Sequence, residues 1–217
     1  MTVEFEVANL FPTPVAGVTL DYDFNKLKEF KKFSLHSANN KVANQIQEVF
    51  NPAEPDFYIL DKVPEIKKYL TNVVRDLLNT QYGYQDTFVI NTSWLTKMVP
   101  SAQGQKHDHI GQTFSAVLYF DEYKILSSNL TLFSPLNKIN RWGLKNHPEN
   151  PATWKDYIVT PKKNLLIVFP SYLDHQIGWN ESQDTRYSLA FNILPLNTYN
   201  GHDSQVNMKK LIEENAC

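Results

Sequence analysis

Three histidines have the spacing expected of a metal site. His107 and His109 are separated by one residue, and His175 lies in a later β-prone segment. On an extended strand, residues i and i+2 point to the same side, so His107 and His109 can converge on one ion. His175 would complete a facial set and leave other coordination positions open, which is typical of a catalytic metal. The ligand type alone does not choose between zinc and iron.

An arginine after the third histidine indicates what else the site binds. Arg186 lies on the strand predicted to follow His175, and Ser188 comes at i+2 on the same face. A guanidinium beside a hydroxyl is suited to binding a carboxylate through two hydrogen bonds. A buried arginine is costly unless something anionic pairs with it. Tyr119 shares strand parity with the first two histidines, so it can face the same cavity if no bulge intervenes.

The second half of the chain has the texture of a β-protein. Short β-prone runs separated by Gly, Pro, Asn and Asp predict strands at 87–96, 112–120, 129–134, 156–160, 164–170, 175–179 and 186–194. Such a set must close or stack to bury its faces and edges, which predicts a barrel or jelly roll.

The first half is predicted to support these strands. Strands are expected at 3–9 and 15–20, and helices at about 23–33, 39–50 and 62–80. The last of these helices keeps a 3.6-residue apolar period, with Asp61 available as a cap and Pro64 in its first turn. A final amphipathic helix is expected at about 204–214.

Composition narrows the class of protein. A chain of 217 residues that is 42% hydrophobic is most simply one globular domain. The net charge of −2 without a basic stripe argues against nucleic-acid binding. The single cysteine, Cys217, excludes an internal disulfide and fits a reducing compartment. No secretory signal and no long apolar run stand out, so we expect a cytoplasmic protein without membrane contact.

Several motifs occur together in a recognisable order. They are Leu10-Phe11-Pro12-Thr13-Pro14, Ser93-Trp94, His107-Asp108-His109, Ser115-Ala116-Val117-Leu118-Tyr119-Phe120, Val168-Phe169-Pro170, His175 and Arg186-Tyr187-Ser188-Leu189-Ala190-Phe191-Asn192. This set resembles the Fe(II)- and 2-oxoglutarate-dependent oxygenases. In particular it is similar to a group related to prolyl hydroxylases that is found in bacteria and marine phages. The resemblance spans nearly the whole chain, and a phage origin is compatible with it.

The resemblance implies a fold and a domain plan. The fold would be α+β but mainly β, a double-stranded β-helix (jelly roll) with an N-terminal helical layer. Residues 1–217 would form a single oxygenase domain, with strand and helical support in 1–85, the β-helix core in 86–196 and a C-terminal helix in 197–217.

The resemblance also implies a site and an activity. His107, His109 and His175 would hold Fe(II), and no catalytic residue is expected beyond these metal ligands. Arg186, helped by Tyr119 and Ser188, would bind the distal carboxylate of 2-oxoglutarate, and O2 would be the second cosubstrate. The protein would be a dioxygenase that hydroxylates a C–H bond of an unknown substrate, with a peptidyl (prolyl) residue or a small molecule as the options. The oligomeric state is not predicted.

Alternatives remain open at the second ligand and at the level of function. Most of the wider superfamily has a carboxylate where this chain has His109, so Asp108 could replace it, although strand alternation sends Asp108 to the opposite side. A halogenase is a further alternative, but it would leave His107 without a role. Other function classes are a cupin-type metalloenzyme without a keto-acid and a non-enzymatic β-sandwich binding module. The segment 135–160 is either an ordinary connection or a lid over the metal.

Overall fold

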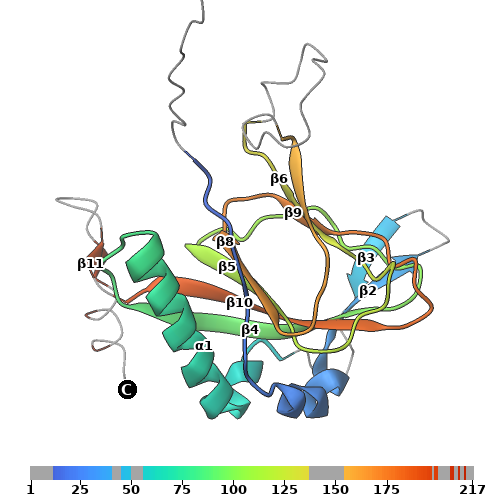
Figure 1. Ribbon diagram of the computed structural model, residues 1–217, viewed down its shortest axis with the longest axis horizontal. Helices are drawn as coiled ribbons and strands as arrows, with labels where there is room; N and C mark the ends of the chain where they lie inside the picture. Colours follow the sequence, from blue (N-terminus) through green and yellow to red (C-terminus); the bar gives the residue numbers. More distant parts are fainter. Residues whose placement is uncertain are drawn as a thin grey trace, which may run out of the picture.

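The described part of the protein consists mainly of a large and a small β-sheet, with few helices (Figure 1). The computed structural model describes residues 12–40, 45–49, 56–136 and 154–196, together with 198–199, 206–207, 210 and 213. Within these residues a seven-stranded sheet has the order β1-β8-β5-β10-β4-β2-β3, and a three-stranded sheet has the order β7-β6-β9. A separate short pair joins β11 and β12. The architecture is therefore mainly β.

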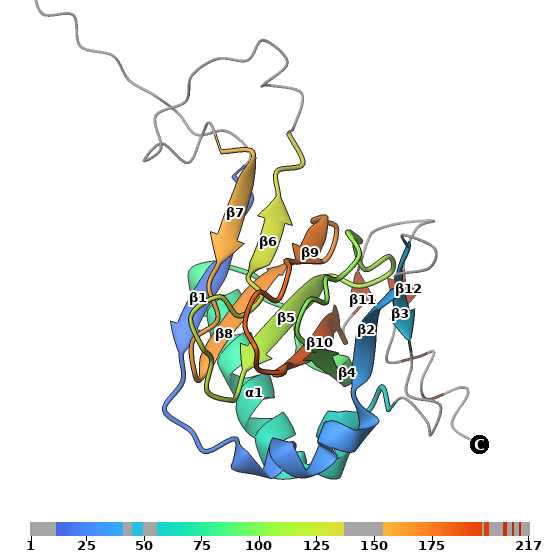
Figure 2. The same cartoon turned by 90° about the vertical axis from the view of Figure 1, so that its right-hand side faces the viewer.

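The strands of the large sheet come from both halves of the chain. They are β1 (Ala16–Thr19), β2 (Leu35–Asn40), β3 (Gln45–Val49), β4 (Phe88–Met98), β5 (Phe114–Tyr119), β8 (Leu165–Pro170) and β10 (Arg186–Pro195). The small sheet contains β6 (Leu130–Phe133), β7 (Asp156–Val159) and β9 (His175–Ile177). The remaining pair is β11 (Thr198–Tyr199) with β12 (Val206–Asn207). Figure 2 shows the small sheet beside β8 and β5 of the large one.

Strand β10 organises the centre of the large sheet. It runs antiparallel to β4 on one side and to β5 on the other. Ala190 lies opposite Trp94 of β4 and opposite Val117 of β5. A β-bulge between Phe191 and Ile193 shifts the register against β4. Because side chains alternate along a strand, the even-numbered positions from Arg186 onward share one face of the sheet.

Helix α1 (Pro64–Asp76) covers the opposite face. Pro64 stands in its first turn, where a missing amide hydrogen costs nothing. Ile66, Leu70 and Val74 recur at helical spacing and are buried in one cluster with side chains of β4, β5 and β10. The turn η3 (Leu77–Gln81) continues the helix and buries Leu78. Two short 3₁₀ segments, η1 (Asn25–Phe33) and η2 (Ile59–Lys62), close the end of this layer.

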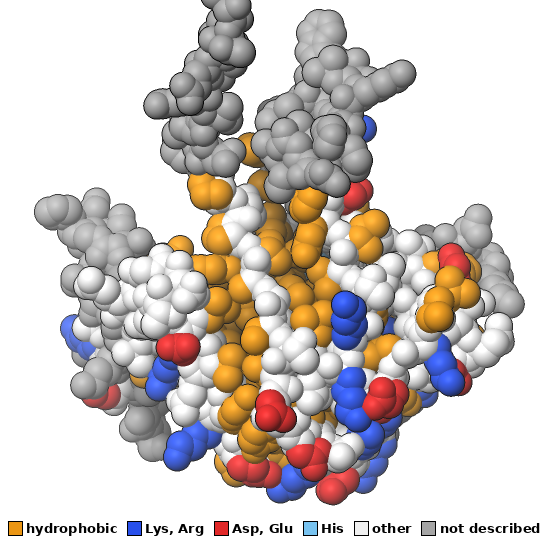
Figure 3. Space-filling view, viewed as in Figure 1, with side chains coloured by type: hydrophobic (Ala, Val, Ile, Leu, Met, Phe, Trp, Pro, Cys, Tyr) orange, Lys and Arg blue, Asp and Glu red, His pale blue; other side chains and the backbone are white. Residues whose placement is uncertain are grey.

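A second apolar cluster fills the space between the two sheets. It joins Tyr119 of β5 and Phe169 of β8 to buried side chains of β6 and β7. In the space-filling view, apolar side chains gather over the middle of the face, and charged ones lie mainly toward its lower half (Figure 3). No described helix is long and apolar enough to cross a membrane.

The strands predicted for the second half are all present, but two predictions for the first half are wrong. Residues 39–50 were expected to be helical, yet β2 and β3 occupy most of this range. The strand residues of this range pair in the β2–β3 hairpin, in which Asn39 lies opposite Ile46, and this pairing overrides local helical preference. Asp61 does not cap α1, because its carboxylate binds Lys67 while Val63 stands at the N-cap.

The remaining expectations are modified or lie outside the described residues. The predicted helix at 23–33 is a 3₁₀ helix rather than an α-helix. Within the range expected for the C-terminal helix, residues 206–207 form a strand, whereas the described residues 210 and 213 are helical. The predicted strand at 3–9 and residues 137–153 of the 135–160 segment lie outside the described residues.

Candidate functional site

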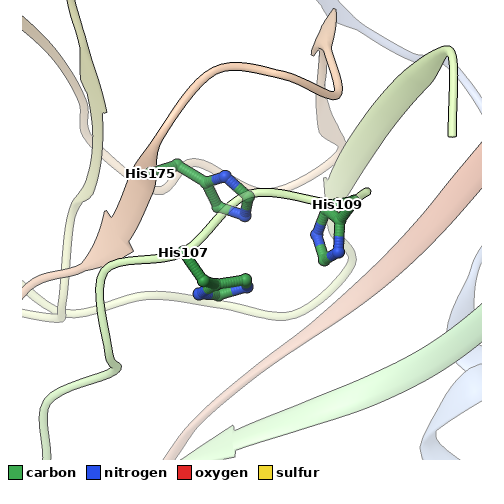
Figure 4. Close-up of side chains that lie close together, drawn as sticks. All are labelled: His107, His109 and His175. Atoms are coloured by element: carbon green, nitrogen blue, oxygen red, sulfur yellow. The ribbon is translucent and has the colours of Figure 1, made fainter. Parts of the chain in front are cut away.

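The three predicted histidines meet at one point (Figure 4). One ring nitrogen from each of His107, His109 and His175 lies within 4.8 Å of the other two. The ring centroids are 4.4 Å apart for His107 and His175, and 5.0 Å for His109 and His175. His175 comes from β9, whereas His107 and His109 lie on the segment between β4 and β5. Three imidazoles at this spacing form a potential metal-binding cluster.

The chain brings them together by a route that differs from the prediction. His107 and His175 form an isolated antiparallel bridge, with N–O distances of 3.0 and 2.8 Å. His109 lies beyond this bridge, and its amide donates to the carbonyl of Ser171 at 3.0 Å. A turn follows at once, in which Gly111 has φ of 81°. His107 and His109 therefore lie on an isolated bridge and the residues just after it, not on one continuous strand.

Hydrogen bonds fix the tautomer of two of the rings. Nδ1 of His107 lies 2.9 Å from the carbonyl oxygen of Gln105, and Nδ1 of His175 lies 3.0 Å from that of Leu173. A carbonyl oxygen only accepts hydrogen bonds, so each Nδ1 carries the proton and donates it. The lone pair is then on Nε2, which is the arrangement that metal-binding histidines use.

Burial keeps two of the rings neutral. It lowers the pKa of His109 to about 4, with a further contribution from His107. Burial likewise lowers the pKa of His175 to about 3, and the neighbouring His107 and His109 add to this effect. At neutral pH both rings are uncharged, as a metal ligand must be.

Asp108, the alternative ligand, lies outside the cluster. Its side chain is exposed at the mouth of the cavity, and the group of three metal-binding side chains does not contain it. The alternation that separates Asp108 from its two histidine neighbours thus has the predicted result. The halogenase alternative is disfavoured, because His107 is one of the three clustered rings.

Arg186 is the most unusual polar residue of the site. Its side chain is 2% exposed, and none of its three guanidinium nitrogens has a hydrogen-bond partner among the described residues. Its guanidinium carbon lies 5.0 Å from the centre of the Tyr119 ring. Leaving a buried cation without an anion costs several kcal/mol. The site is therefore built to receive an anion.

Tyr119 and Ser188 accompany Arg186 in different ways. Ser188 is buried and lines the same cavity two residues along β10. Tyr119 is fully buried, is not among the residues that line the cavity, and packs with its ring against the guanidinium of Arg186. Its hydroxyl also has no partner among the described residues. Burial raises the pKa of Tyr119, and the nearby Arg186 opposes this shift.

One cavity of about 540 Å³ contains both the histidine cluster and Arg186. Sequence reasoning did not assign several of its lining residues to the site. These are chiefly Phe57, Thr92, Trp94, Ile110, Gln112 and Asn192. Parity along β10 was a usable signal for Asn192, because Arg186, Ser188 and Asn192 share a face. Nothing in the sequence pointed to Phe57, which is distant along the chain.

A comparison with protein families matches the part of the chain that contains this site. Residues 92–192 match the model of a family described as "Putative 2OG-Fe(II) oxygenase", where 2OG is 2-oxoglutarate. The matched part runs from β4 to β10 and contains the three histidines, Arg186 and Ser188. None of the curated proteins matches the chain in sequence.

One solved structure shows the same fold over most of the chain. It is the non-heme α-ketoglutarate-dependent carbocyclase SnoK from nogalamycin biosynthesis, with 11% identity and a TM-score of 0.55 over 88% of this chain and 84% of that one.

Two other structures are similar over a smaller part. An oxidoreductase of the 2OG-Fe(II) oxygenase family from Burkholderia pseudomallei has 13% identity and a TM-score of 0.40, covering 56% of both chains. A Pseudomonas putida prolyl-4-hydroxylase has 20% identity and a TM-score of 0.40, covering 61% of this chain and 64% of that one. The alignment thus spans less than two thirds of either protein. With the family match and the fold of SnoK, the resemblance predicted from the motifs is confirmed as one to the 2OG-Fe(II) oxygenases.

Proposed function

We propose that this protein is an Fe(II)- and 2-oxoglutarate-dependent dioxygenase that hydroxylates a C–H bond. His107, His109 and His175 hold the iron, and Arg186 binds the distal carboxylate of 2-oxoglutarate with help from Ser188 and Tyr119. The observation that carries the proposal is the buried Arg186, whose nitrogens have no partner among the described residues, in the same cavity as three clustered imidazoles.

The residues present fit both groups. His107 and His175 each keep a lone pair on Nε2, and burial holds His109 and His175 neutral, which suits a divalent metal. The planar guanidinium of Arg186 matches a carboxylate that it can bind through two hydrogen bonds. When bound, iron and 2-oxoglutarate supply the oxidative chemistry, in which O2 is activated as 2-oxoglutarate is converted to succinate and carbon dioxide.

The protein contributes orientation and a dry environment. The apolar cluster that contains Tyr119 and Phe169 lies beside Arg186: the Tyr119 ring contacts the guanidinium, and Phe169 also lines the cavity. Excluding water lowers the local dielectric constant, which strengthens the attraction between the guanidinium and a carboxylate. The tyrosine hydroxyl, also buried without a partner among the described residues, is a second hydrogen-bond donor for that carboxylate.

We propose a three-histidine centre rather than one with Asp108. A ligand set without a carboxylate leaves the metal site more positive, so the iron affinity and reactivity should differ from those of a centre with two histidines and one carboxylate.

We also propose that the two sheets form a double-stranded β-helix and that residues 1–217 make a single oxygenase domain. Strands from before residue 86 join the large sheet at both of its edges, which supports one unit rather than a separate N-terminal support. A peptidyl residue such as proline is the first substrate class to examine.

Two other function classes account less well for the site. A cupin-type enzyme that binds its substrate directly on the metal has no use for a buried arginine. A non-enzymatic β-sandwich module explains neither Arg186 nor the gathering of three imidazoles.

The proposal is tested by incubating the protein with Fe(II), 2-oxoglutarate and O2 and measuring succinate. We expect slow succinate formation without a primary substrate, and direct binding of 2-oxoglutarate to metal-loaded protein under anaerobic conditions. If 2-oxoglutarate is neither bound nor consumed by protein that retains one metal ion per chain, the cosubstrate assignment is wrong.

A further inference from the structure

Within the described part of the chain, the strand that carries Arg186 is paired on one side at that residue. Strand β10 pairs with β4 from Arg186 onward, but its pairs with β5 begin at Leu189. Arg186, Tyr187 and Ser188 therefore extend past the end of the β5 ladder. Backbone groups at such an open edge need another partner when they are buried from water. The position of Arg186 and Ser188 thus depends on β4 and on whatever binds the free edge of β10.

The hydroxyl of Tyr123 binds this free edge. It donates to the carbonyl oxygen of Tyr187 at 2.5 Å, and Tyr187 stands between Arg186 and Ser188 in the chain. The backbone amide of Asp121 donates in turn to the same hydroxyl at 3.3 Å. A phenolic hydroxyl can donate and accept at once, so the two contacts are compatible. Tyr123 thus joins the loop after β5 to the start of β10.

The loop that carries Tyr123 is itself anchored. The carboxylate of Asp121 lies 2.5 Å from the ammonium of Lys31 and 3.4 Å from that of Lys28, and both lysines belong to η1. Lys31 also lies 4.4 Å from the centre of the Tyr187 ring. A side chain can position a neighbour only if its own base is held by packing and hydrogen bonds. These contacts give Tyr123 a fixed base beside the start of β10.

The ring of Tyr123 supports the same site from a second direction. Its centre lies 5.5 Å from that of the Tyr119 ring, with 84° between the two planes, which is an edge-to-face contact. The guanidinium carbon of Arg186 lies 5.0 Å from the centre of the same Tyr119 ring. Tyr123 therefore contacts both the ring beside the guanidinium and the backbone of the strand from which Arg186 projects.

Arg186 has no hydrogen bond within the described residues to orient it. None of its guanidinium nitrogens has a partner there, so its direction before an anion binds depends on packing. Burial raises the pKa of Tyr123, and the nearby charge of Arg186 opposes this shift. The hydroxyl is therefore protonated at neutral pH and remains a donor. Binding of a carboxylate through two hydrogen bonds depends on the direction of the guanidinium, because both bonds weaken when it turns.

We propose that Tyr123 is a positioning residue for the carboxylate site. It holds Tyr119 and the start of β10 so that the guanidinium of Arg186 faces the distal carboxylate of 2-oxoglutarate. This inference rests on the proposed function and adds a residue that is not among those lining the cavity. Because Tyr123 acts through its neighbours, its loss should weaken recognition of the distal carboxylate and leave binding of the keto-acid end unchanged.

The test compares two keto-acids in Tyr123→Phe, which keeps the ring and removes the hydroxyl. The full-length protein, loaded with Zn(II), is titrated by calorimetry with 2-oxoglutarate and with 2-oxopentanoate, which lacks the distal carboxylate. We expect 2-oxoglutarate to bind Tyr123→Phe about three- to tenfold more weakly than the wild type, which corresponds to the loss of one hydrogen bond. The affinity for 2-oxopentanoate should be the same in both proteins.

Two further variants separate the hydroxyl from the ring. Tyr123→Leu also removes the contact with Tyr119, so its preference for 2-oxoglutarate over 2-oxopentanoate should fall by more than about tenfold. Tyr82→Phe is the matched control and should keep the preference of the wild type. The Tyr82 hydroxyl is also buried, but it has no partner among the described residues, and its ring packs against the apolar cluster that contains helix α1.

The outcomes separate the two proposals. If the wild-type protein does not bind 2-oxoglutarate, the proposed function fails and this inference fails with it. If the wild type binds 2-oxoglutarate but Tyr123→Phe keeps the same preference, or loses affinity for both keto-acids equally, Tyr123 has a structural role and the positioning inference alone is overturned. Thermal unfolding before each titration identifies the variants that are folded. If Tyr123→Leu is not folded, Tyr123→Phe decides.

Discussion

Replacing Arg186 by methionine should separate stability from cosubstrate binding. Methionine keeps an unbranched side chain that fills irregular space but removes the charge and all guanidinium hydrogens. Arg186 is 2% exposed and has no hydrogen-bond partner among the described residues. The substitution therefore breaks no hydrogen bond with a described residue.

Arg186→Met should affect the stability of the protein and its affinity for 2-oxoglutarate differently. In the protein without 2-oxoglutarate, Arg186→Met removes an uncompensated buried charge, whose desolvation costs several kcal/mol. It also removes the contact with the Tyr119 ring at 5.0 Å, which is worth up to about 2 kcal/mol. The desolvation cost is the larger, so the free energy of unfolding should stay the same or rise. For 2-oxoglutarate, loss of a buried charge pair costs about 2–5 kcal/mol, which is roughly a 30- to 4,000-fold weaker affinity.

Calorimetry with two keto-acids makes the assay specific. In 2-oxopentanoate a methyl group replaces the distal carboxylate of 2-oxoglutarate. The wild-type protein, loaded with a redox-inert metal, should strongly prefer 2-oxoglutarate, and Arg186→Met should abolish that preference. Ser188 occupies the neighbouring position on the same face. Ser188→Ala should remove only one hydrogen bond to 2-oxoglutarate and weaken its binding by about 0.5–1.5 kcal/mol. An Arg186→Met protein that still prefers 2-oxoglutarate, or that unfolds more readily than wild type, would refute the reasoning.

Three further predictions address the metal, a close approach and the core. Adding Zn(II) to metal-free protein at a free concentration about 100-fold above Kd should stabilise it by about 2.7 kcal/mol, seen as a rise of roughly 5–11 °C in Tm, and the absence of any shift would contradict a preformed site. Gly104→Ala places a methyl group 3.2 Å from Cβ of Ile177, so unfolding in urea should show a loss of about 1–3 kcal/mol in the free energy of unfolding. Gly178→Ala, whose nearest contact is 3.4 Å, should lose less. Equal losses for the two variants would argue against the close approach to Ile177 as the cause. Leu70→Ala should cost about 2–5 kcal/mol without changing 2-oxoglutarate affinity, because Leu70 packs on the face opposite the cavity, whereas the exposed Lys68→Ala should be close to neutral and serves as its reference.

The strands of the second half were predictable because local chemistry determines them. Turn-forming residues bound each β-prone run, so the predicted 164–170 and 186–194 closely match β8 (Leu165–Pro170) and β10 (Arg186–Pro195). The helix predicted at 39–50 is wrong, because this range contains the end of β2 and all of β3, which pair in a hairpin. The hairpin joins the large sheet through residues 35–37 of β2, which pair with the distant strand β4, and the sequence within 39–50 carries no sign of that contact.

The three histidines that were expected to share a site lie together. The alternation of His107, Asp108 and His109 holds although His107 forms an isolated bridge with His175 rather than part of a regular strand. Tyr119 lies beyond the turn at Gly111, across which parity does not carry, and it is not among the residues that line the cavity. The burial of Arg186 was predictable, because it stands in an otherwise apolar strand.

The aromatic lining of the cavity was not predictable in the same way. Trp94 was part of a recognised motif but carried no signal for a role, and Phe57 reaches the cavity only through the tertiary fold. Isolated aromatic residues have many structural uses, so their type and position alone do not mark a binding surface.

The central claim is that three imidazoles and one guanidinium jointly hold iron with 2-oxoglutarate. Anaerobic absorption spectroscopy tests it most directly, because a keto-acid chelated to Fe(II) gives a weak visible band. Titrating Fe(II)-loaded protein with 2-oxoglutarate should produce this band with saturation at one equivalent per chain, and His175→Ala should eliminate it. Protein that retains its iron but develops no band at saturating 2-oxoglutarate would contradict the account.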